Sequence, residues 1–204
     1  ELCWQCEPDG CFIAEDRGKP VGHVFSVTYG RVGWIGLLIV KAEERGKGIG
    51  AILVEHAIKH LQDRDANRMS LEAVEKAVPL YRRLGFREEF ASLRFKKQLK
   101  PKDRPKTTLS DDLRTVRVKK EDLQELADFD SRYFGSNRLR VLQSLYHDQP
   151  QECLVAKRTF RTAGYIMWRD RLPKAHWIGP WMCEDKDVAE QLLFTCERTI
   201  KRET

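Results

Sequence analysis

The feature that most constrains the fold is a glycine-rich turn between an apolar run and an amphipathic helix. Residues 34–40 read Trp-Ile-Gly-Leu-Leu-Ile-Val, a continuous apolar run that predicts a strand covered on both faces. Residues 45–50 follow as Arg-Gly-Lys-Gly-Ile-Gly, and apolar residues then recur at helical spacing from Ile49 to Asp63. Strand, turn and helix in this order predict a layered sheet with helices packed on it, an α/β or α+β fold.

The turn has the composition of an anion-binding site. Gly46, Gly48 and Gly50 let a ligand approach the backbone with no Cβ in the way. The first turn of the following helix leaves N–H groups without internal partners, and the positive end of its dipole favours anions. Arg45 and Lys47 add positive charge, so the segment predicts a phosphate or diphosphate site. A glycine turn that only joins strand to helix is the alternative.

Two familiar phosphate motifs do not match this segment. A P-loop requires GxxxxGK followed by Ser or Thr, which the sequence lacks. A GxGxxG fingerprint begun at Gly46 or Gly48 puts its last position at Ala51 or Leu53, and no acidic residue on a following strand completes the pattern.

The rest of the sequence indicates two domains. The order strand, strand, strand, helix occurs at residues 11–63 and again at 153–201, a period of about 140 residues that indicates duplicated domains rather than a solenoid. We expect a first domain at 1–98, a linker at 99–112 and a second domain at 113–204. The linker is rich in Lys, Pro and Thr and poor in large apolar residues.

Local patterns predict the elements of each domain. In the first we expect a hairpin over 11–29, a strand at 69–74, a helix at 77–84 ended by Gly85, and a strand at 86–97. In the second we expect helices at 121–134, 138–146 and 187–201, with strands at 153–157, 162–169 and 176–182.

Two segments of the first half resemble one family. Arg45 to Gly50 resembles the R/Q-x-x-G-x-G/A signature of the GNAT acetyltransferase superfamily, with Val40 five residues before the Arg. Leu80-Tyr81-Arg82-Arg83-Leu84-Gly85-Phe86 resembles the late YxxLGF element of that family. The resemblance covers about residues 11–97 and implies the GNAT fold, a mixed twisted sheet flanked by helices.

The second half resembles the degenerate C-terminal domain of tandem GNAT proteins. The resemblance rests on residues 130–138, Gly164-Tyr165 and Ile178-Gly179-Pro180. No RxxGxG equivalent follows Trp181, and residues 182–187 form an acidic turn instead. The resemblance further implies that the first domain lacks its N-terminal strand and helices and that the second is truncated at its C-terminus.

The resemblance also implies roles for particular residues. The backbone of Leu38, Ile39 and Val40 would pair with the pantetheine arm of acetyl-CoA, with the Leu38 N–H as a donor to the thioester oxygen. The diphosphate would be surrounded by Arg45, Gly46, Lys47, Gly48, Ile49, Gly50 and Ala51. Tyr81 matches the general acid of the family, although a half-buried aromatic whose hydroxyl bonds the backbone is the alternative. The general base stays open between His23, Glu72 and a bound water.

The expected reaction is transfer of an acetyl group from acetyl-CoA to a primary amine by direct attack, on a small molecule or a protein. The alternative is a regulatory module that holds acyl-CoA without turnover. The chain carries 37 Lys and Arg against 31 Asp and Glu, a net charge of +6 that suits a polyanionic partner. The basic stretch from Lys96 to Lys106 reads as a solvated linker rather than a nucleic-acid site.

Cysteine spacing and hydropathy indicate whether the protein binds zinc or enters a membrane. The six cysteines lie at positions 3, 6, 11, 153, 183 and 196, and no second ligand pair follows the CxxC at residues 3–6 at a usual zinc spacing. We therefore expect reduced thiols and no metal. Without a signal peptide or an apolar run of membrane length, we expect a cytoplasmic protein with no membrane partner.

Overall fold

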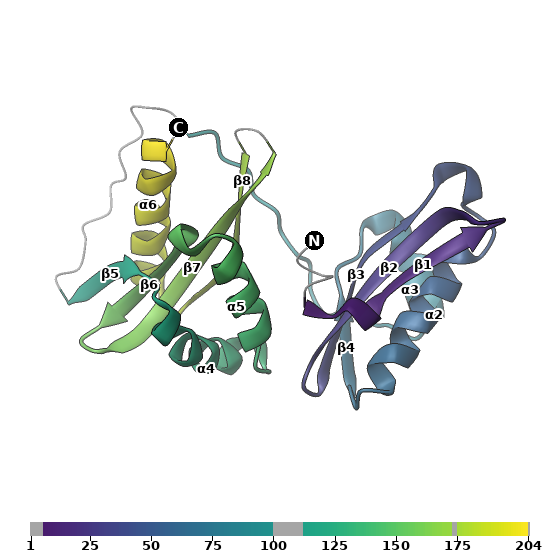
Figure 1. The fold of residues 1–204 in the computed structure, drawn as a ribbon, viewed down its shortest axis with the longest axis horizontal. Coiled ribbons are helices and arrows are strands. Elements are labelled where there is room, and N and C mark those ends of the chain that lie inside the picture. The colour runs from purple at the N-terminus through teal and green to yellow at the C-terminus, as the bar shows by residue number, and fades with distance from the viewer. Residues whose placement is uncertain (1–5, 100–111, 173–174, 204) are drawn as a thin grey trace. The chain divides into compact units, whose positions relative to one another are not determined.

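The computed structural model describes residues 6–99, 112–172 and 175–203. The chain divides into two compact units, residues 1–94 and 95–204, each built around its own sheet (Figure 1). The linker expected at 99–112 lies outside the described residues except at its two end positions.

The first unit is a four-stranded sheet covered by helices. Its strands have the spatial order β1-β2-β3-β4 and are β1 (Cys11–Asp16), β2 (Lys19–Tyr29), β3 (Val32–Val40) and β4 (Arg68–Leu71). β1, β2 and β3 are antiparallel, whereas β4 runs parallel to β3. The helical segments are η1 (Pro8–Gly10), η2 (Ala42–Glu44), α2 (Ile49–Gln62), η3 (Glu75–Ala77) and α3 (Val78–Arg83). The expected hairpin and both expected helices are confirmed.

The conformation of the hairpin turn follows from its two loop residues. Asp16 pairs with Lys19, which leaves Arg17 and Gly18 as a two-residue loop. Both loop residues have positive φ, 49° and 75°. Two positive φ values give a turn whose twist matches that of the flanking strands, and glycine adopts such a conformation without strain.

Helix α2 forms the core of the first unit by packing on the sheet. Leu53, Val54, Ala57 and Leu61 are all at most 3% exposed and recur at helical spacing. A Cβ placed on Gly33 of β3 would lie 2.7 Å from Leu61 Cδ1, so the helix contacts the strand at a position that only glycine fills without displacing a core side chain.

We predict that Leu61→Ala destabilises the first unit by about 2–5 kcal/mol, because the truncation leaves a cavity under α2. Hydrogen exchange of the β2 and β3 amides measures the loss within this unit alone. Ile52→Ala on the same helix is the control, since Ile52 is 53% exposed. Equal losses from the two variants would contradict this account of the core.

The expectation that residues 34–40 form a strand covered on both faces is wrong for its second half. Leu37 and Ile39 are 52% and 53% exposed. Both side chains point to the face of the sheet opposite α2, the helix toward which Leu38 and Val40 pack. β4 pairs with β3 only from Val32 to Ile35. Beyond Ile35, the edge of β3 that faces β4 has no strand neighbour among the described residues.

The strand expected at residues 86–97 is also wrong. This segment belongs to no strand, and Phe90 and Leu93 are 84% and 76% exposed. Among the described residues, no strand forms hydrogen bonds with this segment, and a β-strand requires a hydrogen-bonded partner strand. The strand expected at 69–74 is confirmed in its first part only, since β4 ends at Leu71.

The second unit is an antiparallel sheet with the order β5-β6-β7-β8. Its strands are β5 (Leu113–Arg117), β6 (Cys153–Arg158), β7 (Arg161–Leu172) and β8 (Ala175–Cys183). Its helical segments are η4 (Lys120–Asp122), α4 (Leu123–Phe134), α5 (Leu139–Asp148), η5 (Pro150–Glu152) and α6 (Lys186–Glu203). The expected helices and strands are present, and β5 is an addition that the sequence pattern did not predict.

Helices cover both faces of this second sheet (Figure 1). Val188, Leu192 and Cys196 of α6 are fully buried against Leu154 and Ile166. The side chains that alternate with these on β6 and β7 face α4 and α5, since Tyr165 reaches a buried residue of α4. The predicted repeat of the order strand, strand, strand, helix is therefore confirmed. It occurs first as β1-β2-β3-α2 and again as β6-β7-β8-α6.

Candidate functional site

The turn from β3 to α2 presents a run of free backbone donors. Gly46 and Gly48 both have a φ of 83°, and Gly48 is the N-cap of α2, with no side chain capping it. In the part of the chain that the structure describes, the N–H groups of Gly46, Lys47, Gly48, Ile49 and Gly50 have no acceptor. Five consecutive free donors next to a helix N-terminus are the kind of group that binds an anion.

The space around the turn is open. A Cβ on Gly46 or Gly48 would meet no atom within 4 Å, so glycine is required there by the backbone conformation and not by crowding. Ala51 lies at the limit of the site, because its N–H already donates to the Gly48 carbonyl oxygen at 2.9 Å. The donor set therefore ends at Gly50, one residue short of the range expected from the sequence.

The two positively charged side chains of the turn both contact other groups of the protein. Arg45 Nε donates to the Val40 carbonyl oxygen at 3.0 Å, which ties the guanidinium to the end of β3. Lys47 Nζ contacts Glu44 Oε2 at 2.7 Å, and this hydrogen bond raises the pKa of Lys47. Lys47 is thus a cation with a carboxylate partner that a bound anion would replace. The i,i+3 spacing of Glu44 and Lys47 was a signal for this pair that the sequence reading missed.

The open edge of β3 lies directly before this turn. Between Phe25–Gly36 and His23–Ile39, the pairing with β2 shifts by one residue, and Leu37 within this bulge has a φ of 52°. Leu38 and Val40 pack towards the α2 side of the sheet, since both approach the position of a Cβ on Gly50. Ile39 is exposed, and the backbone from Gly36 to Val40 has no β4 partner. An extended ligand can therefore pair with this edge.

Tyr81 lies in α3, within the core cluster that includes Leu53. The residue is 8% exposed, and its ring meets that of Phe86 edge-on at 6.0 Å. Burial raises the pKa of Tyr81, so the phenol is protonated at neutral pH. Its hydroxyl has no hydrogen-bond partner within the described ranges, which leaves its proton available to a ligand.

The two base candidates lie on β2 and just after β4, two strands that are separated by β3. Glu72 directly follows the last residue of β4, is exposed, and accepts a hydrogen bond from the Ser92 hydroxyl at 3.1 Å. His23 of β2 is exposed and pairs with Ile13 on one side and Ile39 on the other. No contact in the structure links either side chain to Tyr81, and the base stays open between them.

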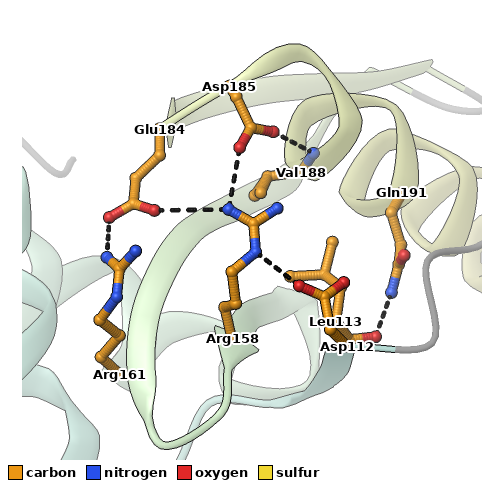
Figure 2. Close-up of polar contacts among 8 residues, drawn as sticks. All are labelled: Asp112, Leu113, Arg158, Arg161, Glu184, Asp185, Val188 and Gln191. Carbon is orange, nitrogen blue, oxygen red and sulfur yellow. Dashed lines mark hydrogen bonds and ion pairs between the residues drawn. The ribbon is translucent and has the colours of Figure 1, made fainter.

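The corresponding turn of the second unit, between β8 and α6, is filled by the protein's own charges (Figure 2). Asp185 accepts a hydrogen bond from the Val188 N–H at 2.9 Å and pairs with Arg158 at 3.0 Å. Arg158 also contacts Asp112 at 3.1 Å and Glu184 at 3.8 Å, and Glu184 pairs with Arg161. A carboxylate thus takes the position at the helix start where an anionic ligand would sit, so this turn is degenerate.

We predict that Asp185→Ala destabilises the second unit by about 1 kcal/mol at neutral pH through loss of the α6 N-cap. The Val188 hydrogen bond and Arg158 hold the pKa of Asp185 below its usual range, so its stabilisation is present at neutral pH. That stabilisation is lost as the pH falls through this lowered pKa. Denaturant titrations at pH 7 and pH 3, with Asp187→Ala as control, test this. A difference from the parent that is unchanged at pH 3 would refute it.

The described residues contain neither a metal-binding cluster nor a helix that could span a membrane. Among the described residues no cluster of three His, Cys, Asp or Glu side chains could hold a metal ion. None of the helices in those ranges is long and apolar enough to cross a membrane. Residues 100–106 of the basic stretch lie outside the described part, and Lys97 pairs with Glu197 at 2.6 Å.

Comparison with known families agrees with this geometry in both units. The Acetyltransferase (GNAT) family matches residues 2–86, and the Acetyltransferase (GNAT) domain matches residues 126–203. A strand with an open edge, followed by a glycine turn at a helix start, defines the class in the first unit. The chain belongs to the GNAT acetyltransferase family and carries two GNAT domains in tandem. The family and fold predicted from the sequence are confirmed.

Individual relatives match either most of this chain or less than half of it. The uncharacterized N-acetyltransferase YitH of Bacillus subtilis is 26% identical over 182 residues, 86% of this chain and 60% of that protein. N-alpha-acetyltransferase MAK3 of Arabidopsis thaliana is 36% identical over 86 residues, 39% of this chain and 45% of its own length. A crystal structure of an acetyltransferase candidate from Pyrococcus horikoshii superposes with a TM-score of 0.78 at 22% identity, covering 97% of this chain and 64% of that one.

Proposed function

We propose that the protein is an N-acetyltransferase that transfers the acetyl group of acetyl-CoA to a primary amine by direct attack. The observation that carries this proposal is the run of five free N–H groups directly after an open strand edge. The amides of the pantetheine arm of acetyl-CoA can pair with the strand edge, and its diphosphate can accept hydrogen bonds from the free N–H groups. The order of these two parts in acetyl-CoA matches the order of edge and turn along the chain. Because the chain spans between 41% and 60% of the length of the first three curated relatives, their activities enter here only as support.

Binding of acetyl-CoA is assigned to backbone groups. The N–H groups of residues 46–50 would hold the diphosphate, with Arg45 and Lys47 supplying charge once Lys47 leaves Glu44. The edge of Leu38, Ile39 and Val40 would pair with the pantetheine amides. A donor on this edge, the Leu38 N–H, would stabilise the negative charge that develops on the thioester oxygen.

The chemistry needs two proton transfers. The amine nitrogen forms a bond to the acetyl carbon, the C–S bond breaks, and the sulfur leaves as a thiolate. Tyr81 is assigned as the donor of a proton to this sulfur, because its hydroxyl is protonated and has no partner in the described part of the structure. The proton lost by the amine goes to a base, either His23, Glu72 or a bound water.

We predict that Gly48→Trp abolishes acetyl-CoA binding in calorimetric titration. The indole would stand over the donor run, and a side chain at a φ of 83° adds roughly 1–2 kcal/mol of local strain. Gly18→Trp is matched for strain, since Gly18 has a φ of 75° and also faces open space, but it lies in the hairpin turn. Unchanged binding by a folded Gly48→Trp variant would rule out the diphosphate site.

We predict that Tyr81→Phe lowers kcat about 100-fold or more while the Kd for acetyl-CoA stays within about twofold. The ring and its contact with Phe86 are kept, and only the proton donor is removed. Release of free CoA thiol over a panel of small amines and peptides measures kcat. Unchanged turnover would remove Tyr81 as the acid. Binding without turnover on any amine would favour the module that holds acyl-CoA as a regulatory ligand.

A further inference from the structure

Helix α3 lies beside the start of α2. A Cβ on Gly50, in the first turn of α2, would lie 3.6 Å from Leu80 Cδ2 of α3 and 3.8 Å from Val40 Cγ2. Leu80 therefore marks the side of α3 that is turned toward the first turn of α2, which carries the last of the free N–H groups. Side chains on this side of α3 border the site proposed for the diphosphate.

Two arginines at the end of α3 lie on different sides of the helix. At about 100° per residue, Arg83 is about 60° from Leu80 around the helix axis, whereas Arg82 is about 160° from it. Residues three apart on a helix are neighbours on its surface. Arg83 is therefore on the side of the α2 start, and Arg82 is on the other side.

The two arginines also differ in their partners. Arg82 Nε donates to Glu88 Oε1 at 2.7 Å. Arg83 is exposed and has neither a hydrogen bond nor an ion pair within the ranges that the structure describes. Arg45 and Lys47 of the turn, in contrast, both contact protein groups. Arg83 is thus a guanidinium near the anion site whose fork of N–H donors is available to a ligand.

The chemistry of CoA leaves one anionic group to be bound. Its diphosphate is assigned to the N–H groups of residues 46–50, and its third phosphate is a monoester on the 3′-oxygen of the ribose next to that diphosphate. A phosphate monoester carries nearly two negative charges at neutral pH. A guanidinium binds such an anion through two parallel N–H···O bonds. Arg83 is about 4.5 Å from Leu80 along the helix axis, and its long side chain extends beyond that.

We propose that Arg83 binds the 3′-phosphate of CoA and thereby makes the first unit select CoA thioesters over thioesters that lack this phosphate. The inference rests on the proposed function, in which residues 46–50 hold the diphosphate. Acyl groups carried on phosphopantetheine alone, as on an acyl carrier protein, have no 3′-phosphate. The acyl donor is therefore free acyl-CoA, selected through a residue that takes no part in the transfer reaction.

Calorimetric titration of the whole chain with CoA and with 3′-dephospho-CoA tests this inference. The parent should bind CoA at least about tenfold more tightly, because the charge-assisted hydrogen bonds form only with CoA. Arg83→Gln should reduce the ratio of the two affinities to about twofold or less, while its Kd for dephospho-CoA stays within about twofold of the parent's.

The outcomes separate this inference from the proposed function. Equal affinity of the parent for the two ligands, or a ratio that Arg83→Gln leaves unchanged, would overturn the role of Arg83 and leave the diphosphate site standing. A parent that binds neither ligand would overturn the proposed function itself, and this inference with it.

Two variants control for a general loss of positive charge. Arg82→Gln removes the arginine on the other side of α3, and Lys41→Gln removes a lysine whose backbone N–H donates to the Val21 carbonyl oxygen of β2. All three side chains are exposed, so the variants should fold as the parent does. Arg82→Gln and Lys41→Gln should keep the parent's ratio of affinities. An equal fall of the ratio in all three variants would overturn the assignment to Arg83.

Discussion

The architecture of the first unit depends on the point at which β3 and β4 stop pairing, which is Ile35. Four residues of parallel pairing hold the two strands together, and the remainder of β3 continues with a free edge. The pairing of β3 with β2 is interrupted by the bulge at Leu37 and resumes at Ile39 and Val40, which anchors this part of β3 on its other side. The edge precedes the glycine turn, so the free strand edge and the proposed anion site follow each other along the chain.

The two units share the same order of strands and helix but differ at the turn that joins the third strand of this order to the helix. In the first unit, two glycines of positive φ leave the helix start uncapped and its donors free. In the second unit, Asp185 caps the helix and Arg158 gathers three carboxylates around it. The backbone electrostatics of a helix N-terminus are common to both, so the difference between an open and a filled site lies in a few side chains.

The sequence predicted what is encoded locally. Hairpin, helices and glycine turn follow from residue spacing and turn chemistry, and all are found where expected. The tertiary features were not predictable in this way. The exposure of Leu37 and Ile39 depends on which face of the sheet α2 covers, and the absence of a strand at 86–97 depends on a missing neighbour. In the site, the glycines were evident from their spacing, whereas the hydrogen bond of the Ala51 N–H inside the helix required coordinates.

The uncapped start of α2 would link the lifetime of the protein to the proposed ligand. Free donors leave the first unit below the stability that it reaches when an anion occupies them, whereas the second unit carries its own cap. A ligand present at ten times its Kd adds roughly 1.4 kcal/mol to the folded state of the unit that binds it. Proteases that act on transiently opened chains would then remove the unliganded protein first. Cellular abundance would rise and fall with the supply of that ligand, with no dedicated sensor.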